Sequence, residues 1–187
     1  MLKLKVLVVG PCEAGKTHFS NFVSDQAENA GGEYRPTQGV RILEFETPLT
    51  KSKGRSGSID VELWDCSGDH KYESCWAAMA KDASGIIFLY NPDQPSQSSD
   101  LESWHSYFTS SSKVKPNQCA LVIRSQRQLY ELEDVIPAAF SKIQHIKSNI
   151  EEDGDTVKME FTKFIESIAN ALSEKNEQDE LNIVKES

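Results

Sequence analysis

The sequence predicts one α/β domain with a mostly parallel six-stranded sheet and helices on both faces. The length of 187 residues fits a single domain. Short apolar runs alternate with amphipathic stretches, which is typical of βαβ units. Hydrophobic residues make up 38% of the chain and charged residues 26%, so a core can form without disulfides or a structural metal.

Six apolar runs are expected to form the strands. One of them, residues 85–90, is uninterrupted and therefore belongs in the centre of a sheet that is covered on both faces. The run at 143–146 is the weakest. The six strands are expected at residues 4–9, 40–45, 59–64, 85–90, 119–123 and 143–146.

Apolar residues at helical spacing predict the helices and the sides that face the core. The first helix is expected from Lys16 through Val23, before a polar loop at 28–38, and residues 50–58 are expected to form a solvated hairpin tip. Two longer helices carry aromatic stripes: Leu101, Trp104, Tyr107 and Phe108 in one, and Val157, Phe161, Phe164, Ile165, Ile168 and Leu172 in the last.

The apolar pattern ends near Leu172, so we expect a domain at residues 1–172 and an acidic C-terminal tail at 173–187. Two interpretations of the tail stay open. It is either frayed, or it binds a partner through Leu181, Ile183 and Val184.

Charge and composition exclude several functions. The 20 Lys and Arg against 29 Asp and Glu give a net charge of -9, which argues against nucleic-acid binding as the main activity. No apolar run approaches the roughly 20 residues of a membrane span. Leu2 and the missing C-terminal cysteine predict no lipid anchor. The four cysteines form no CxxC pair, so reduced thiols in a cytoplasmic protein are expected.

A phosphate-binding loop is the strongest motif. The pattern GxxxxGK[ST] follows a buried strand and opens a helix, where backbone N–H groups and the helix N-terminus can surround phosphate oxygens. Lys16 would supply a charge to the outer phosphates and Thr17 a hydroxyl to Mg²⁺. The expected phosphate-site residues are Gly10, Pro11, Cys12, Glu13, Ala14, Gly15, Lys16, Thr17 and His18.

Three further residues extend this site. Asp65 closes the strand at 59–64, at the edge where a carboxylate can hold Mg²⁺ through water. Gly68 can bring a backbone N–H to a terminal phosphate. Thr37, in the loop at 28–38, can ligate Mg²⁺ when a third phosphate closes that loop. We therefore expect Thr17, Thr37 and Asp65 to hold the metal.

Together these motifs resemble those of the Ras-like small GTPases, a P-loop NTPase family, over residues 2–172. Within that family, the runs at 36–46, 62–69 and 73–76 and the missing lipidation cysteine resemble the Rab-like subunit of the intraflagellar transport B complex most closely. The resemblance implies binding of GTP or GDP with Mg²⁺. It also implies coiled-coil partners within that complex and a location in the cytoplasm and in the cilium or flagellum and its base.

Two departures from the family pattern predict slow hydrolysis. Asp69 stands where the family has the Gln that orients the attacking water, and an ionised carboxylate cannot donate a hydrogen bond. Cys12 stands where many members have Gly and would crowd the space that the water uses. No confident catalytic residue is therefore expected.

The base-binding motif departs further. The family reads guanine with Asn-Lys-x-Asp, whereas here the strand at 119–123 continues into Arg124, Ser125, Gln126 and Arg127. Arg127 has no acceptor for the N1 and N2 protons of guanine. Either arginine could instead stack on the base or contact the ribose, and Ser148 and Asn149 could contact the base edge. We expect GTP to bind, with ATP competing better than in an ordinary member.

Three functions are compared. The favoured one is an atypical GTP-binding subunit with weak or absent hydrolysis; the alternative is a cycling GTPase switch in vesicle or ciliary trafficking. A P-loop kinase is disfavoured, because no Arg-rich lid or acceptor pocket is evident. The expected docking face comprises residues 37–40, Phe45, Trp64 and residues 72–76, with core packing as the alternative role of Tyr72 and Trp76.

Overall fold

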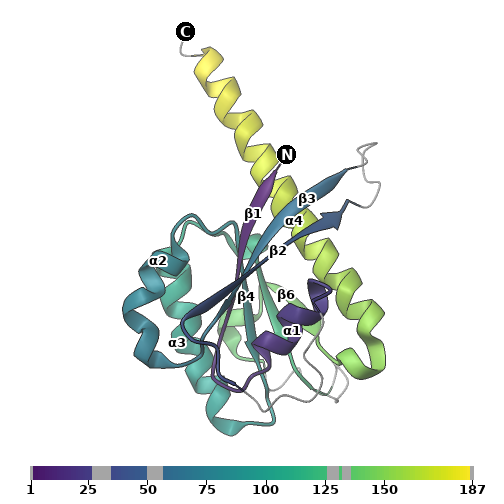
Figure 1. The fold of residues 1–187 in the computed structure, drawn as a ribbon. Coiled ribbons are helices and arrows are strands. Elements are labelled where there is room, and N and C mark those ends of the chain that lie inside the picture. The colour runs from purple at the N-terminus through teal and green to yellow at the C-terminus, as the bar shows by residue number, and fades with distance from the viewer. Residues whose placement is uncertain (1, 27–34, 50–56, 126–130, 132–135, 186–187) are drawn as a thin grey trace.

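The fold is an α/β sandwich around one six-stranded sheet, as the sequence predicts (Figure 1). The computed structural model describes residues 2–26, 35–49, 57–125, 131 and 136–185, with side chains through Glu174. The strands are β1 (Lys3–Val9), β2 (Val40–Pro48), β3 (Ser58–Cys66), β4 (Gly85–Tyr90), β5 (Cys119–Ile123) and β6 (Gln144–Lys147).

The strand order β2-β3-β1-β4-β5-β6 places β1 and β4 in the interior of the sheet. All pairs are parallel except β2 with β3, which forms a hairpin in register from Val40↔Cys66 to Pro48↔Ser58. The carboxyl ends of the five parallel strands therefore meet at one edge of the sheet, where ligands bind in open α/β folds. These strands are β1, β3, β4, β5 and β6.

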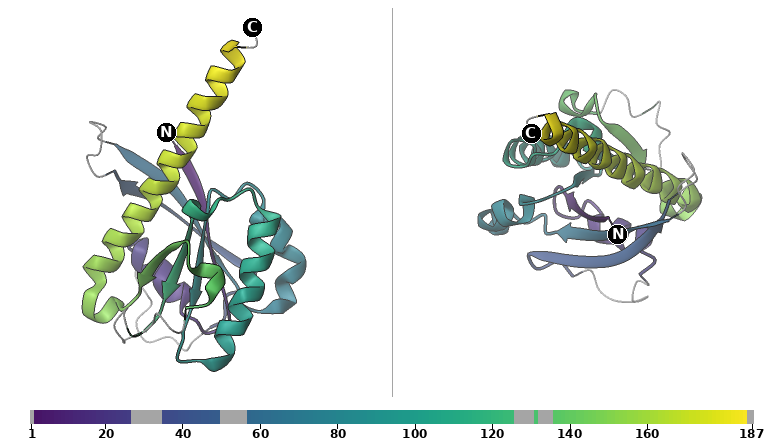
Figure 2. Two further views of the ribbon diagram at one scale, coloured as in Figure 1. Left: turned by 180° about the vertical axis from the view of Figure 1, so that it is seen from behind. Right: turned by 90° about the horizontal axis from the view of Figure 1, so that it is seen from above.

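Helices cover both faces of the sheet (Figure 2). One core cluster contains Phe19 of α1 and Phe161 of α4, and the other contains Trp76 of α2 and Trp104 of α3. The helices are α1 (Lys16–Val23), α2 (Trp76–Ala80), α3 (Pro95–Ser111) and α4 (Ile150–Lys185), with short 3₁₀ segments η1 (His70–Cys75), η2 (Pro116–Gln118) and η5 (Ala138–Phe140).

The last helix is longer than the apolar pattern predicts. Helix α4 continues to Lys185, beyond Leu172, and its C-terminal part extends past the sheet (Figures 1 and 2). Residues 173–185 contain no Gly or Pro and several good helix formers, so the backbone stays helical after the apolar stripe ends. A frayed backbone from Ser173 was therefore the wrong expectation, while a domain boundary at 172 remains a prediction.

Two expected loops lie partly or wholly outside the described residues. These are the polar loop at 28–38, of which residues 28–34 are not described, and the hairpin tip at 50–58, of which residues 50–56 are not described. The hairpin strands themselves are longer than expected, because backbone pairing continues to Pro48 and Ser58 although the apolar pattern does not.

Candidate functional site: a nucleotide pocket at the ends of the strands

The phosphate loop connects β1 to α1 in a conformation that requires glycine at both ends. Gly10 and Gly15 have φ angles of 141° and 101°, which L side chains rarely adopt. A Cβ on Gly10 would lie 2.2 Å from the carbonyl oxygen of Leu89 in β4. The loop is therefore packed directly against the sheet.

Lys16 is buried beneath this loop. Its Nζ donates to the carbonyl oxygens of Gly10 (2.8 Å) and Pro11 (2.5 Å), and only 6% of the residue is exposed. Burial lowers the pKa of Lys16 to about 8, and the nearby Asp65 carboxylate opposes this shift. The ammonium group thus donates to two neutral acceptors and lies near one carboxylate, and an anion at the loop would further favour its charged form.

Gln97 of α3 also holds the loop, although no sequence motif includes it. Its Nε2 donates to the carbonyl oxygen of Cys12 (3.0 Å), and its Oε1 accepts from the Asn91 N–H (2.8 Å). Gln97 is 6% exposed. A buried glutamine in an otherwise polar stretch has no sequence signal, because burial depends on the tertiary packing of α3.

The three expected metal residues meet beside the loop. The Thr17 hydroxyl donates to Asp65 Oδ2 (2.8 Å), and Thr17 Oγ1 lies 3.0 Å from Thr37 Oγ1. Asp65 is fully buried, and its Oδ1 has no hydrogen-bond partner within the described part of the chain. Burial raises the pKa of Asp65, and the Thr17 hydroxyl and the Arg41 guanidinium oppose this.

Arg41 of β2 is a second residue that the motifs did not reveal. Its Nη2 lies 3.5 Å from Asp65 Oδ2 and also donates to Asn21 Oδ1 of α1. Strand β2 reaches Asp65 because Arg41 and Asp65 are direct partners in the β2–β3 pairing. Arg41 thereby helps to balance the buried Asp65 charge, as Lys16 does.

Gly68 lies in direct contact with the phosphate loop. A Cβ on Gly68 would come within 2.4 Å of the Cys12 nitrogen and 2.7 Å of Lys16 Nζ. The backbone after β3 therefore packs directly against the phosphate loop, and any side chain at position 68 would displace that loop.

Asp69 immediately precedes η1, and its side chain is turned toward Lys71 of that segment. One carboxylate oxygen accepts from the Lys71 N–H (3.0 Å) and the other lies 2.9 Å from Lys71 Nζ. These two interactions lower the pKa of Asp69, so the group is ionised at neutral pH. It can accept but not donate a hydrogen bond.

A pocket of about 230 Å³ opens next to the loop. Five residues expected at the nucleotide site line it: Gly15, His18, Arg124, Ser148 and Asn149. The Arg124 side chain lies against the loop, since a Cβ on Gly15 would be 2.9 Å from its Cδ. Residues not expected there are Leu89, Asn91, Asp93, Ser125, Ile150 and Glu151. Arg127 lies outside the described residues.

The expected docking face needs two corrections. Trp76 is 3% exposed and packs with its ring centroid 4.2 Å from that of Trp104, so it belongs to the core. Phe45 is half-buried against Phe161 of α4. Tyr72 and Trp64 are only partly covered, and Ile42, which the sequence analysis did not single out, is 47% exposed on β2.

No helix in the described part of the chain combines the length and apolar character needed to span a bilayer.

Comparison with known proteins places these features in a family. Residues 5–126 match the family model described as Ras of Complex, Roc, domain of DAPkinase. The chain is 42% identical over 186 residues to the intraflagellar transport protein 22 homolog of Danio rerio and 40% identical to that of Homo sapiens, covering 98% of this chain and 100% of each relative. It is 30% identical to intraflagellar transport associated protein 2 of Caenorhabditis elegans, over 88% of this chain and 78% of that protein.

The fold is also that of a solved structure titled T. brucei IFT22/74/81 GTP-bound. The two chains superpose with a TM-score of 0.69 at 23% identity, covering 90% of this chain and 98% of the other. The expected Ras-like family and the narrower resemblance are both confirmed: this chain belongs to the intraflagellar transport protein 22 family of small-GTPase-like proteins.

Proposed function

We propose that this protein is a guanine-nucleotide-binding subunit of the intraflagellar transport B complex, with very slow hydrolysis. The observation that carries the nucleotide site is the meeting of Thr17, Thr37 and Asp65 beside the buried Lys16. Two hydroxyls, a carboxylate and an ammonium group at one edge of the sheet form the chemistry that holds a phosphate chain and its metal.

The residues fit Mg²⁺. The ion prefers oxygen ligands, and Asp65 Oδ1 is buried with no hydrogen-bond partner in the described part of the chain. The hydroxyls of Thr17 and Thr37 would ligate the metal, and Asp65 would hold it through water. When bound, Mg²⁺ would neutralise charge on the outer phosphates.

Thr37 and Gly68 would make the site sensitive to the third phosphate. The loop that carries Thr37 is joined to the segment after β3: the Ser67 N–H donates to the Gly39 carbonyl oxygen (2.8 Å), and the Tyr72 hydroxyl donates to Gln38 (2.6 Å). A phosphate that draws in Thr37 and Gly68 would therefore order both segments together.

Slow hydrolysis follows from the two departures at the site. Asp69 is ionised and turned toward Lys71, so it offers no donor to orient a water molecule. Cys12 places a side chain where many family members have none. The alternative function, a cycling GTPase in vesicle or ciliary trafficking, shares Thr37 and Gly68 but requires a faster reaction or an activator.

The base is proposed to be guanine. Support comes from the T. brucei relative, whose structure is titled GTP-bound, and from the family match. ATP is the competitor that the loss of the usual Asp at position 127 would favour, and direct competition decides between the two nucleotides.

The partners are proposed to be coiled-coil subunits of the B complex, at the cilium or flagellum and its base and in the cytoplasm. Support comes from the relative's title, which names IFT22 together with IFT74 and IFT81. The proposed docking face comprises the exposed Ile42 and the partly covered Trp64 and Tyr72, next to the loop that carries Thr37.

Affinity measurements with this protein's own coiled-coil partners test the proposal. Binding is expected to be tighter with a non-hydrolysable GTP analogue than with GDP, and Ile42→Glu should weaken it. Met159→Glu, at a residue with a similar exposure of 48% on α4, is the matched control and should not. Equal loss of binding in both variants, or no binding in any nucleotide state, would contradict the proposed subunit role.

A further inference from the structure

Guanine recognition needs an acceptor that the usual motif lacks here. The N1 and N2 groups of guanine are donors, whereas Arg127 carries only donors. A site that buries those donors without an acceptor would lose much of its preference for guanine. The walls of the pocket are therefore the place to search for a replacement carboxylate.

The topology fixes where the base must lie. Gly15 follows β1, whereas Ser148, Asn149 and Glu151 follow β6, and the pocket reaches both groups. In the sheet order β1-β4-β5-β6, β1 and β6 are three strand spacings apart, or about 14 Å at ~4.8 Å per spacing. A nucleotide with its phosphates at Gly15 therefore extends its base toward the β5–β6 end.

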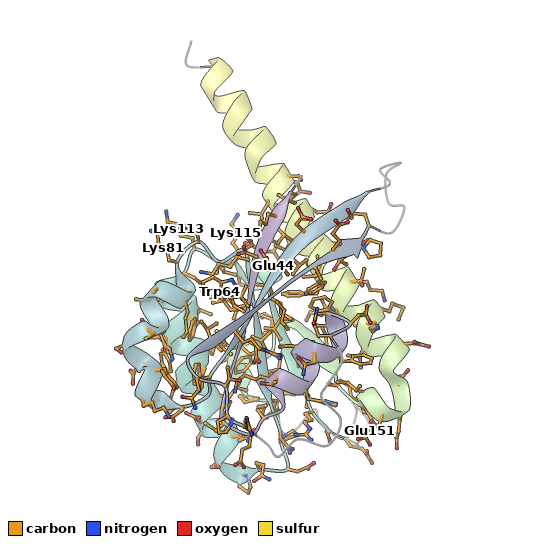
Figure 3. The ribbon with its side chains drawn as sticks, viewed as in Figure 1. Glu44, Trp64, Lys81, Lys113, Lys115 and Glu151 are labelled. Carbon is orange, nitrogen blue, oxygen red and sulfur yellow. The ribbon has the colours of Figure 1, made fainter. Side chains whose placement is uncertain are left out.

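Two carboxylates line the pocket, and they sit at different points along it. Asp93 follows β4, the strand next to β1, and so lies nearer the phosphates and the ribose. Glu151 lies in the first turn of α4, directly after Ser148 and Asn149. Figure 3 shows Glu151 at the lower right of the domain, away from Lys113 and Lys115 at its upper left.

The neighbouring glutamate has a different environment. Glu152 accepts a hydrogen bond from Asn149 Nδ2 (2.5 Å) and is not among the residues that line the pocket. Glu151 lines the pocket and has no hydrogen-bond or ion-pair partner among the side chains that the structure describes. Its carboxylate is thus available to a ligand.

We infer that Glu151 is the specificity-determining acceptor for the base: its carboxylate receives the N1–H and N2–H of guanine in place of the missing Asp. This inference rests on the guanine-nucleotide binding proposed above. It moves the acceptor from the loop after β5 to the first turn of α4.

The hydrogen-bond pattern provides a test that misfolding cannot imitate. Xanthosine triphosphate carries an oxygen where GTP carries the N2 amino group. The Glu151→Gln side chain offers one acceptor and one donor, which match the N1–H and the C2 oxygen of xanthine. The variant is therefore expected to lose GTP affinity by about tenfold or more, the scale of one charge-assisted hydrogen bond, and to gain affinity for the xanthine nucleotide.

Competition titrations of the nucleotide-free full chain, with Mg²⁺ present throughout, measure the change in preference from GTP to xanthosine triphosphate. Glu152→Gln is the matched control and should keep the parent's preference for GTP over xanthosine triphosphate. An unchanged preference in Glu151→Gln, or an exchange produced by Asp93→Asn instead, would overturn the assignment while leaving guanine-nucleotide binding intact. A parent chain that binds no guanine nucleotide would remove the proposed function itself.

Discussion

The hydroxyl oxygens of Thr17 and Thr37 lie 3.0 Å apart, although the two residues come from different sides of the segment that follows α1. Thr17 opens that helix, and Thr37 precedes β2. Their shared neighbour is the buried Asp65 carboxylate, which accepts from Thr17. This triangle of oxygens joins the phosphate loop, the loop before β2 and the end of β3 at one point.

Replacing Thr17 by Asn should weaken the triphosphate more than the diphosphate, because the variant lacks the hydroxyl that would ligate the metal between the outer phosphates. The loss should be about tenfold or more for the triphosphate in Mg²⁺. Titrations with GTP and GDP measure it. Thr109→Ala, which removes a hydroxyl that donates to the His105 carbonyl oxygen on α3, is the control and should bind as the parent does. Equal triphosphate affinities for Thr17→Asn and the parent would contradict the metal site.

Gly68→Ala should reduce nucleotide affinity by about tenfold or more, a loss on the scale of one hydrogen bond to a charged group. The added methyl group would lie 2.4 Å from the Cys12 nitrogen and must displace the phosphate loop. Gly57→Ala is the matched control, because its methyl group would make an ordinary 3.7 Å contact with Leu49. Nucleotide affinity and the thermal midpoint are measured for both. If both variants bind as tightly as the parent, Gly68 does not approach the phosphates.

Hydrolysis should be slow, and Asp69→Gln should speed it if it changes the rate at all. The Gln amide can donate a hydrogen bond to orient water, whereas the ionised Asp69 cannot. Asp69→Asn is the matched control: it removes the charge and can still accept from the Lys71 N–H, but its side chain is too short to replace Gln. Single-turnover phosphate release gives the rates. A parent rate on the order of 10 per second, typical of activated family members, would refute the prediction.

Triphosphate affinity should fall as the pH rises above the pKa of Lys16, which burial lowers to about 8 in the free protein. Bound phosphate favours the ammonium form and raises this pKa, so binding takes up a proton in the range between the free and bound pKa values. Below that range Lys16 is charged in both states, and the affinity should be flat. Titrations from about pH 7 to about pH 9 measure the slope, with Lys16→Met as the variant that lacks the titrating group. A parent affinity that does not change over this range would contradict the assignment.

The sequence predicted the sheet well because its signals are local. The uninterrupted apolar run at Gly85–Tyr90 became a fully buried central strand, and the glycines of the phosphate loop adopt the positive φ angles that their positions require. The meeting of Thr17 with Asp65 was predictable for the same reason, since Thr17 comes after β1, Asp65 lies at the carboxyl end of β3, and these parallel strands end at one edge of the sheet.

The remaining features depend on packing between distant segments. Gln97 contacts Cys12 only because α3 lies over the loop, and Glu151 reaches the pocket only because β6 ends next to β5. Neither residue belongs to a motif. Trp76 illustrates the same limit: the sequence left it open between the docking face and the core, and only the packing of α2 and α3 shows that it is buried against Trp104.

Titration of the nucleotide-free chain with GTP, in Mg²⁺ and in a chelator, tests the central claim most directly. We expect saturable binding of one GTP per chain, at least about tenfold tighter in Mg²⁺, and competition by GDP. The absence of binding in both conditions, or equal affinity with and without Mg²⁺, would show that Thr17, Thr37 and Asp65 do not form a nucleotide–metal site.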